Sequence, residues 1–229
     1  MTDTPRPVRT RPRWPWIVGA LALLVVLVVV FALTAARGGD DRAVPATTPP
    51  TPTSTSTDEP GAAVSGCIGG RERDAAMLVA AQKAAPHSAN GAASFAAAFV
   101  RWLYQYPTPP ASDVQTVAKR IYSTGADSKK VIDYLAGSPN LSGGLVPDGQ
   151  PFYVSTVPGV FYVESATPDK VSVSVGGGLV TDGALSATLR ESVTVTAQWE
   201  SGAWHVVESK GTRTTQDLFA IGTAFSGGC

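Results

Sequence analysis

One uninterrupted apolar stretch constrains this chain of 229 residues more than any other feature. Residues 16–36 read WIVGALALLVVLVVVFALTAA and include no charged side chain. As a helix that rises about 1.5 Å per residue, the stretch would span roughly 31 Å, the thickness of the hydrocarbon core of a bilayer. The sequence therefore predicts a single transmembrane helix here, with membrane lipid as its partner.

The charges on either side of this stretch predict its orientation. Residues 1–15 contain four arginines and one aspartate, whereas residues 37–229 contain 14 basic and 17 acidic side chains. Because positively charged flanks stay in the cytoplasm, we expect residues 1–15 to be a basic cytoplasmic tail. The predicted location is the cell membrane, crossed once, with an extracytoplasmic C-terminal domain. That domain lacks the cationic surplus of a nucleic-acid binder, so no nucleic-acid partner is expected.

Two kinds of export signal compete with a retained anchor. The apolar part of a cleaved signal peptide is usually about 7–15 residues, shorter than residues 16–36. Ala32-Leu33-Thr34 nevertheless resembles a small-x-small cleavage site, so cleavage stays an alternative. Val64-Ser65-Gly66-Cys67 resembles a lipobox, but we interpret the match as accidental because it lies far beyond the apolar stretch.

Residues 37–66 form a stretch rich in proline and threonine with almost nothing to bury. Such a composition does not offset the entropy of ordering, so we expect a disordered linker. In the polyproline II limit its residues 38–65 would reach about 85 Å. Residues 67–229 remain as one domain, long enough to bury a core of its own.

The first half of this domain has helical periodicity. Apolar residues are spaced for one helix face over residues 71–85, 90–106, 112–121 and 128–136, with Pro86 and Pro107 as stops. The second of these helices carries the main aromatic stripe, made of Phe95, Phe99, Trp102 and Tyr106. We interpret the stripe as core, with the lining of a ligand pocket as the alternative.

After Pro158 the apolar period changes from about 3.6 residues to two. The alternation predicts strands over residues 160–166, 170–175, 188–199 and 204–210, with a short strand at 152–155 and a hairpin at residues 200–203. Trp199 and Trp204 flank the hairpin and join the core or pocket set. The predicted fold class is α+β, with N-terminal helices packed on a curved antiparallel sheet of about four strands. Gly176-Gly177-Gly178 is expected to form a bulge or bend rather than a phosphate loop.

The two cysteines, Cys67 and Cys229, stand at the first and last positions of the predicted domain. Outside the cytoplasm they could be oxidised together, so we predict a disulfide, with two unpaired thiols as the alternative. A chain-entropy estimate for so long a loop gives about 5 kcal/mol, at the upper end of the range.

Side chains that could carry catalysis are few. His87 and His205 have no second ligand at metal spacing, and no serine lies in a G-x-S-x-G context. Glu164, Glu191 and Glu208 fall on predicted strands, where exposed glutamates are ordinary. We therefore expect no catalytic, metal or cofactor-binding residue, no cofactor, and no enzyme activity.

The hairpin region reads QWESGAWHVV over residues 198–207. With the helices before it, the stretch from about Ala75 to Thr215 resembles the nuclear transport factor 2-like cone fold. It is most similar to the version in bitopic scaffold proteins of conjugative type IV secretion systems, and the composition resembles that of an actinobacterium. The resemblance implies a non-enzymatic assembly protein that self-associates and contacts other membrane or channel proteins.

A second hypothesis is a domain that binds a small molecule or a cell-envelope component in the mouth of the cone, between the Phe95/Trp102 helix and the sheet. It predicts an open pocket with a few convergent polar groups, whereas a cone filled by its own side chains would argue against it.

Overall fold

The computed structural model describes residues 63–138, 140–211 and 213–229. The expectations for the tail 1–15, the transmembrane helix 16–36, its cleavage site and nearly all of the linker 37–66 therefore lie outside the described residues.

The membrane assignment is corrected. Within the described ranges, no helix is long and apolar enough to cross a membrane. The longest, α3 (Ala89–Leu103), has 15 residues, and its apolar side chains are buried within the domain itself. The described residues therefore give no support to single-pass anchoring, or to the cell-membrane location and orientation that depended on it.

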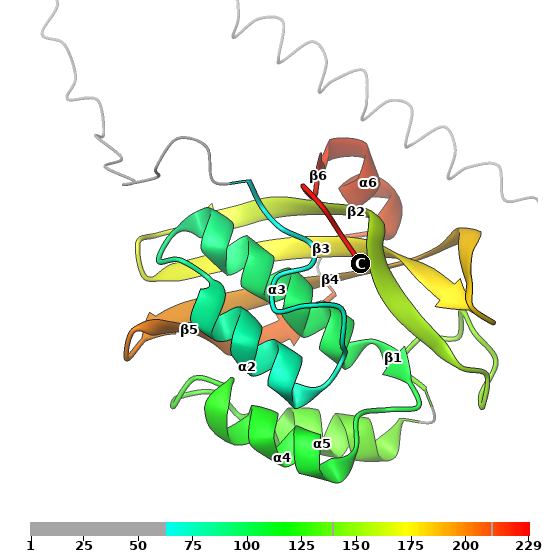
Figure 1. Cartoon of the computed structure of the whole chain (residues 1–229), viewed down its shortest axis with the longest axis horizontal. Coiled ribbons are helices and arrows are strands. Elements are labelled where there is room, and N and C mark those ends of the chain that lie inside the picture. The colour runs from blue at the N-terminus through cyan, green and yellow to red at the C-terminus, as the bar shows by residue number, and fades with distance from the viewer. Residues whose placement is uncertain (1–62, 139, 212) are drawn as a thin grey trace, which may run out of the picture. The chain divides into compact units, whose positions relative to one another are not determined.

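Five helices occur in the described part of the chain, and four of them precede the long strands (Figure 1). Besides α3 they are α2 (Ala75–Ala84), α4 (Ala111–Arg120), α5 (Ser128–Gly137) and α6 (Thr215–Ile221). The carboxylate of Asp74 caps α2 by accepting from the Met77 N–H, and the Ser88 hydroxyl caps α3 by accepting from the Gly91 N–H.

The strands form one antiparallel sheet with the path β1-β2-β3-β4-β5, and β6 pairs with β2. Their bounds are β1 (Gln105–Tyr106), β2 (Phe152–Ala166), β3 (Lys170–Thr181), β4 (Ala184–Glu200), β5 (Ala203–Lys210) and β6 (Thr223–Ala224). The expected count of about four strands is therefore wrong for the described residues, which contain six. The two extra strands have two residues each, too few to show a period of two.

The sheet bends strongly along β2 and β3 (Figure 1). The pairing of these strands shifts register between Ser155 and Gly159, opposite Gly178 and Gly177. A Cβ on Gly177 would lie 2.5 Å from the Ser155 carbonyl oxygen, so this close approach requires glycine. The glycine triplet thus lies inside a strand and permits an irregular register, as the expected bulge does.

The two faces of the sheet have different partners. Helix α3 packs against β2, β3 and β4, and its Phe95, Phe99 and Trp102 are fully buried with the valines of the strands. On the other face, the side chains of α6 approach Gly176, and the hydroxyls of Ser192 and Thr215 are 3.0 Å apart. Odd-numbered positions around Val193 therefore face α3, and even-numbered positions face α6.

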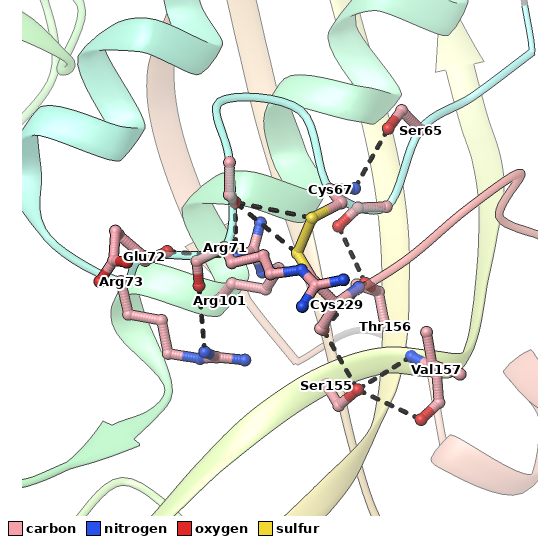
Figure 2. The surroundings of a disulfide bond; sticks show 12 residues. Ser65, Cys67, Arg71, Glu72, Arg73, Arg101, Ser155, Thr156, Val157 and Cys229 are labelled. Carbon is pink, nitrogen blue, oxygen red and sulfur yellow. Dashed lines mark hydrogen bonds between the residues drawn. A yellow bond between two sulfur atoms is a disulfide. The ribbon is translucent and has the colours of Figure 1, made fainter.

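The first and last segments of the described domain are joined (Figure 2). Cys67 and Cys229 form a disulfide with Cα atoms 5.4 Å apart. Thr156 on β2 holds both segments, since its hydroxyl donates to the Gly66 carbonyl at 2.8 Å and accepts from the Cys229 N–H at 3.0 Å. The cystine thus lies against the bend of the sheet.

Candidate functional site

A pocket of about 710 Å³ opens between the end of α3, the loop from α4 to α5, helix α5 and the last two long strands. Its lining comprises Leu103, Tyr104, Tyr122, Gly125, Ala126, Asp127, Lys130, Val131, Tyr134, Val193, Val207, Glu208, Ser209, Lys210 and Gly211. The size falls in the range of small-molecule sites, about 300–1,000 Å³.

The inner part of the pocket is apolar with phenolic edges. Leu103, Val131, Val193 and Val207 supply aliphatic surface, and Tyr104, Tyr122 and Tyr134 supply rings and hydroxyls. Tyr122 is only 8% exposed, and its ring packs edge-on against Phe99. Burial raises the pKa values of Tyr104 and Tyr122, so both phenols stay neutral at physiological pH.

The charges at the rim of the pocket are internally paired. The Lys130 ammonium lies 3.5 Å from the Asp127 carboxylate, and the Lys210 ammonium lies 2.9 Å from the Glu208 carboxylate. All four side chains are about half exposed or more, so each pair contributes little to stability. The rim therefore presents both signs without a surplus of either.

Glu191 stands beside the lining rather than in it. It belongs to β4, two residues before Val193, and the contact of Ser192 with Thr215 directs its neighbours to the α3 face. Burial raises the pKa of Glu191 to about 7, opposed by a hydrogen bond from the Ser192 N–H. Its charge in turn raises the pKa of Tyr104, after burial as the larger cause. Glu191 is thus a desolvated carboxyl next to a tyrosine of the pocket.

None of the six aromatic residues expected as core or pocket lining contributes to this lining. Phe95, Phe99, Trp102 and Trp204 are fully buried in the core. Trp199 is half-buried and stacks on His87, with ring centroids 4.2 Å apart. The pocket instead lies just beyond the end of the aromatic helix, at Leu103 and Tyr104.

Tyr106 departs from the expected helical stripe. Helix α3 ends at Leu103, and Tyr106 lies half-buried in β1, paired with Phe152. The reason is local: the residue before a proline disfavours the helical conformation, and Pro107 follows directly.

Each of the two histidines contacts a polar side chain of the fold. His87 Nε2 lies 2.9 Å from an oxygen of Asp169, and His205 Nδ1 lies 3.5 Å from the Gln82 amide nitrogen. Across the described ranges, no group of three or more His, Cys, Asp or Glu side chains could hold a metal ion. Glu164 is bound by Arg213, with N–O distances of 2.8 and 2.6 Å.

Arg101 is a buried charge that the sequence did not single out. It is fully buried on α3, and its Nη2 donates to the carbonyls of Gly70 and Glu72 at 2.9 and 3.1 Å (Figure 2). Burial, with the nearby Arg73 charge, lowers its pKa to about 10. The side chain secures the loop that carries Cys67.

The residues in and beside the pocket gave different signals in the sequence. Strand alternation places Glu191 on the same face as Val193 and Val195. This pattern could have distinguished Glu191 from the other glutamates on predicted strands. Tyr104 and Tyr122 follow the ends of α3 and α4, where no periodicity applies. Their convergence depends on tertiary packing, because α5 packs on α4 and the end of α4 is hydrogen-bonded to Val206 of β5.

The chain matches no protein-family model, no curated protein and no solved structure. The resemblance to the cone fold of conjugative scaffold proteins therefore stays a prediction, and the site has to be interpreted from its own chemistry.

Proposed function

We propose that this protein binds a small organic molecule in the pocket between α5 and the β4–β5 hairpin. The observation that carries the proposal is the open pocket of about 710 Å³, since a cone filled by its own side chains would leave no room for a ligand. The pocket lies beyond the aromatic helix, and the space between the Phe95/Trp102 helix and the sheet is filled by buried side chains. The proposal therefore keeps the class of the second functional hypothesis drawn from the sequence but not its site.

The lining supports this choice because it has the usual pattern of a ligand site. Aliphatic side chains such as Val131, Val193 and Val207 provide the area that drives burial of an apolar body. The phenols of Tyr104 and Tyr122 provide oriented hydroxyls within that surface. No hydrogen bond from either hydroxyl occurs among the described residues, which leaves both groups to bind a ligand.

The other hypotheses have no comparable support. The assembly role, with self-association and contacts to channel proteins, stays a prediction of the family resemblance. The absence of enzyme activity also stays a prediction. A single raised pKa beside one tyrosine does not identify a reaction, because no reacting atom is placed against Glu191 or Tyr104.

The proposal can be tested with 2-naphthylmethanol, a neutral aromatic probe that fits the volume. Its binding to the full chain would be titrated by ligand fluorescence for the wild type and for Val207→Trp, in which a large ring enters the pocket from β5. The matched control is Val157→Trp, on an exposed residue of β2 outside the lining.

Saturable binding to the wild type and to Val157→Trp, weakened about tenfold or more in Val207→Trp, is the expected result. Absence of saturable binding, or equal binding by both tryptophan variants, would overturn the proposed function. Circular dichroism of each variant would establish that loss of binding does not reflect loss of fold.

A further inference from the structure

The carboxyl of Glu191 stands beside the lining of the pocket, two residues before Val193 on β4. Among the described residues, Glu191 is in no salt bridge, and its one hydrogen bond comes from the backbone N–H of Ser192 at 3.2 Å. By contrast, the carboxylates of the rim, Asp127 and Glu208, are each paired with a lysine. Glu191 is half-buried, and a carboxylate partly withdrawn from water without a counter-ion is costly, so it is an informative feature beside a cavity.

The fold places this carboxyl on the face of β4 that borders the pocket. Ser192 contacts Thr215 on the α6 face, so Glu191 and Val193 share the opposite face, and Val193 lines the pocket. Gly177 is the cross-strand neighbour of Glu191 on β3 and brings no charged group to that face. Tyr104, also in the lining, feels the charge of Glu191.

Three tyrosine rings surround the same space. Tyr104 comes from the end of α3, Tyr122 from the end of α4, and Tyr134 from α5. The face of an aromatic ring attracts a cation, and this attraction is strongest where water is excluded. A carboxylate behind such rings adds a Coulombic attraction in a region of low dielectric constant.

Building on the proposed function, we propose that the ligand is an organic cation, an ammonium group carried on an apolar or aromatic body. The ammonium group would sit toward Glu191 and the tyrosine rings, and the apolar body against the valines of the lining. A free anion is the less suitable ligand, because the only lysines in the lining, Lys130 and Lys210, are each paired with a carboxylate.

The test compares three probes that share one naphthyl body. They are (2-naphthylmethyl)trimethylammonium, the neutral 2-naphthylmethanol and the anionic 2-naphthoate, each titrated against the full chain at pH 8. The expected order of affinity is cation, then neutral probe, then anion, with the cation bound about tenfold more tightly than the neutral probe. A neutral or anionic probe that binds as tightly as the cation would overturn the inference and leave the proposed function standing.

Two substitutions test whether the carboxyl of Glu191 causes the preference for the cationic probe. Glu191→Gln should reduce the affinity for the cation about tenfold while the affinity for 2-naphthylmethanol changes little. Glu164→Gln is the matched control, since Glu164 is bound by Arg213 outside the pocket, and it should leave both affinities unchanged. An equal effect of Glu191→Gln on the cation and on the neutral probe would contradict the assignment.

A pH series gives an independent measure. The quaternary ammonium probe does not titrate, no histidine belongs to the lining, and Tyr104 stays neutral. The other charged groups of the lining, on the loop, α5 and β5, form the two ion pairs already described. Wild-type affinity for the cation should therefore rise between pH 5.5 and 8, by roughly tenfold, as Glu191 ionises. A flat profile would contradict the inference, and failure of all three probes to bind would overturn the proposed function itself.

Discussion

The indole Nε1–H of Trp204 donates a hydrogen bond to the backbone carbonyl of Pro86 at 2.8 Å. This contact joins the start of β5 to the turn between α2 and α3, 118 residues earlier in the chain. Trp204 is fully buried whereas Pro86 is exposed, so the hydrogen bond is shielded from water on the indole side. It fixes how the strand that forms one wall of the pocket lies against the helices.

Replacing this indole tests its structural role. Trp204→Phe should lower the free energy of unfolding by about 1–3 kcal/mol, through lost packing and the lost hydrogen bond. The Ser88 N–H still donates to the Pro86 carbonyl, which limits the cost of the missing donor. Trp199→Phe, at the half-buried tryptophan of the same hairpin, should cost less than about 1 kcal/mol in urea unfolding. Equal costs for the two variants would show that the buried contact has no special weight.

The cystine should contribute measurably to stability, because it closes a loop with a sequence separation of 162 residues. The double variant Cys67→Ala/Cys229→Ala should unfold about 2–5 kcal/mol more easily than the oxidised wild type. Dithiothreitol should lower the stability of the wild type by a similar amount and leave the double variant unchanged. A wild-type urea midpoint that does not respond to reduction would contradict this expectation.

The Glu164–Arg213 pair predicts a loss of stability in acid. The hydrogen bonds from Arg213, with a smaller contribution from Ser174, lower the pKa of Glu164 below its ordinary 4.5. A carboxyl with a lowered folded pKa stabilises the fold above about pH 4.5, and this stabilisation is lost as pH falls through the folded pKa. Glu164→Gln should cost about 1 kcal/mol at pH 7 and flatten the acid branch of the stability profile.

The control for this prediction is Asp133→Asn, which breaks an exposed pair with Lys129 on α5. It should change the free energy of unfolding by no more than about 0.5 kcal/mol. An acid branch that is the same for Glu164→Gln and the wild type would show that another group sets the acid sensitivity.

Glu191 predicts the opposite dependence on pH. Its folded pKa of about 7 lies above the unfolded value of 4.5, so the folded state binds more protons between these limits. The stabilisation from protonated Glu191 is therefore complete below about pH 4.5 and is lost as pH rises through about 7. Relative to the wild type, Glu191→Gln should gain about 1–3 kcal/mol between pH 5 and pH 8. A constant difference between the two proteins across this range would contradict the raised pKa.

Local patterns predicted most of the elements near the pocket. Residues 128–136 were expected to be helical, and α5 spans Ser128–Gly137. The expected strand 204–210 corresponds to β5, and the turn before it has positive φ angles at Ser201 and Gly202. These elements depend on periodicity and turn residues, which a short stretch of sequence contains in full.

Other elements were missed or wrongly divided when local patterns alone were used. Helix α6 has seven residues and was missed, although Thr214 and Asp217 form a capping pair that could have indicated its start. The separation of 152–155 from 160–166 was wrong, because β2 continues through Pro158 as a single irregular strand. The pocket depends on three tyrosines from three separate segments, so its chemistry appears only once the chain is folded.

The most direct test of the account is to locate a bound probe on the full chain. Intermolecular nuclear Overhauser effects between the naphthyl protons of 2-naphthylmethanol and assigned methyl groups would report the contact surface. Effects to the methyls of Val193 and Val207, and none to Val157 or Ile221, are the predicted result. Contacts confined to Val157 and Ile221, on the exposed surface outside the lining, would contradict the claim that the pocket is the binding site.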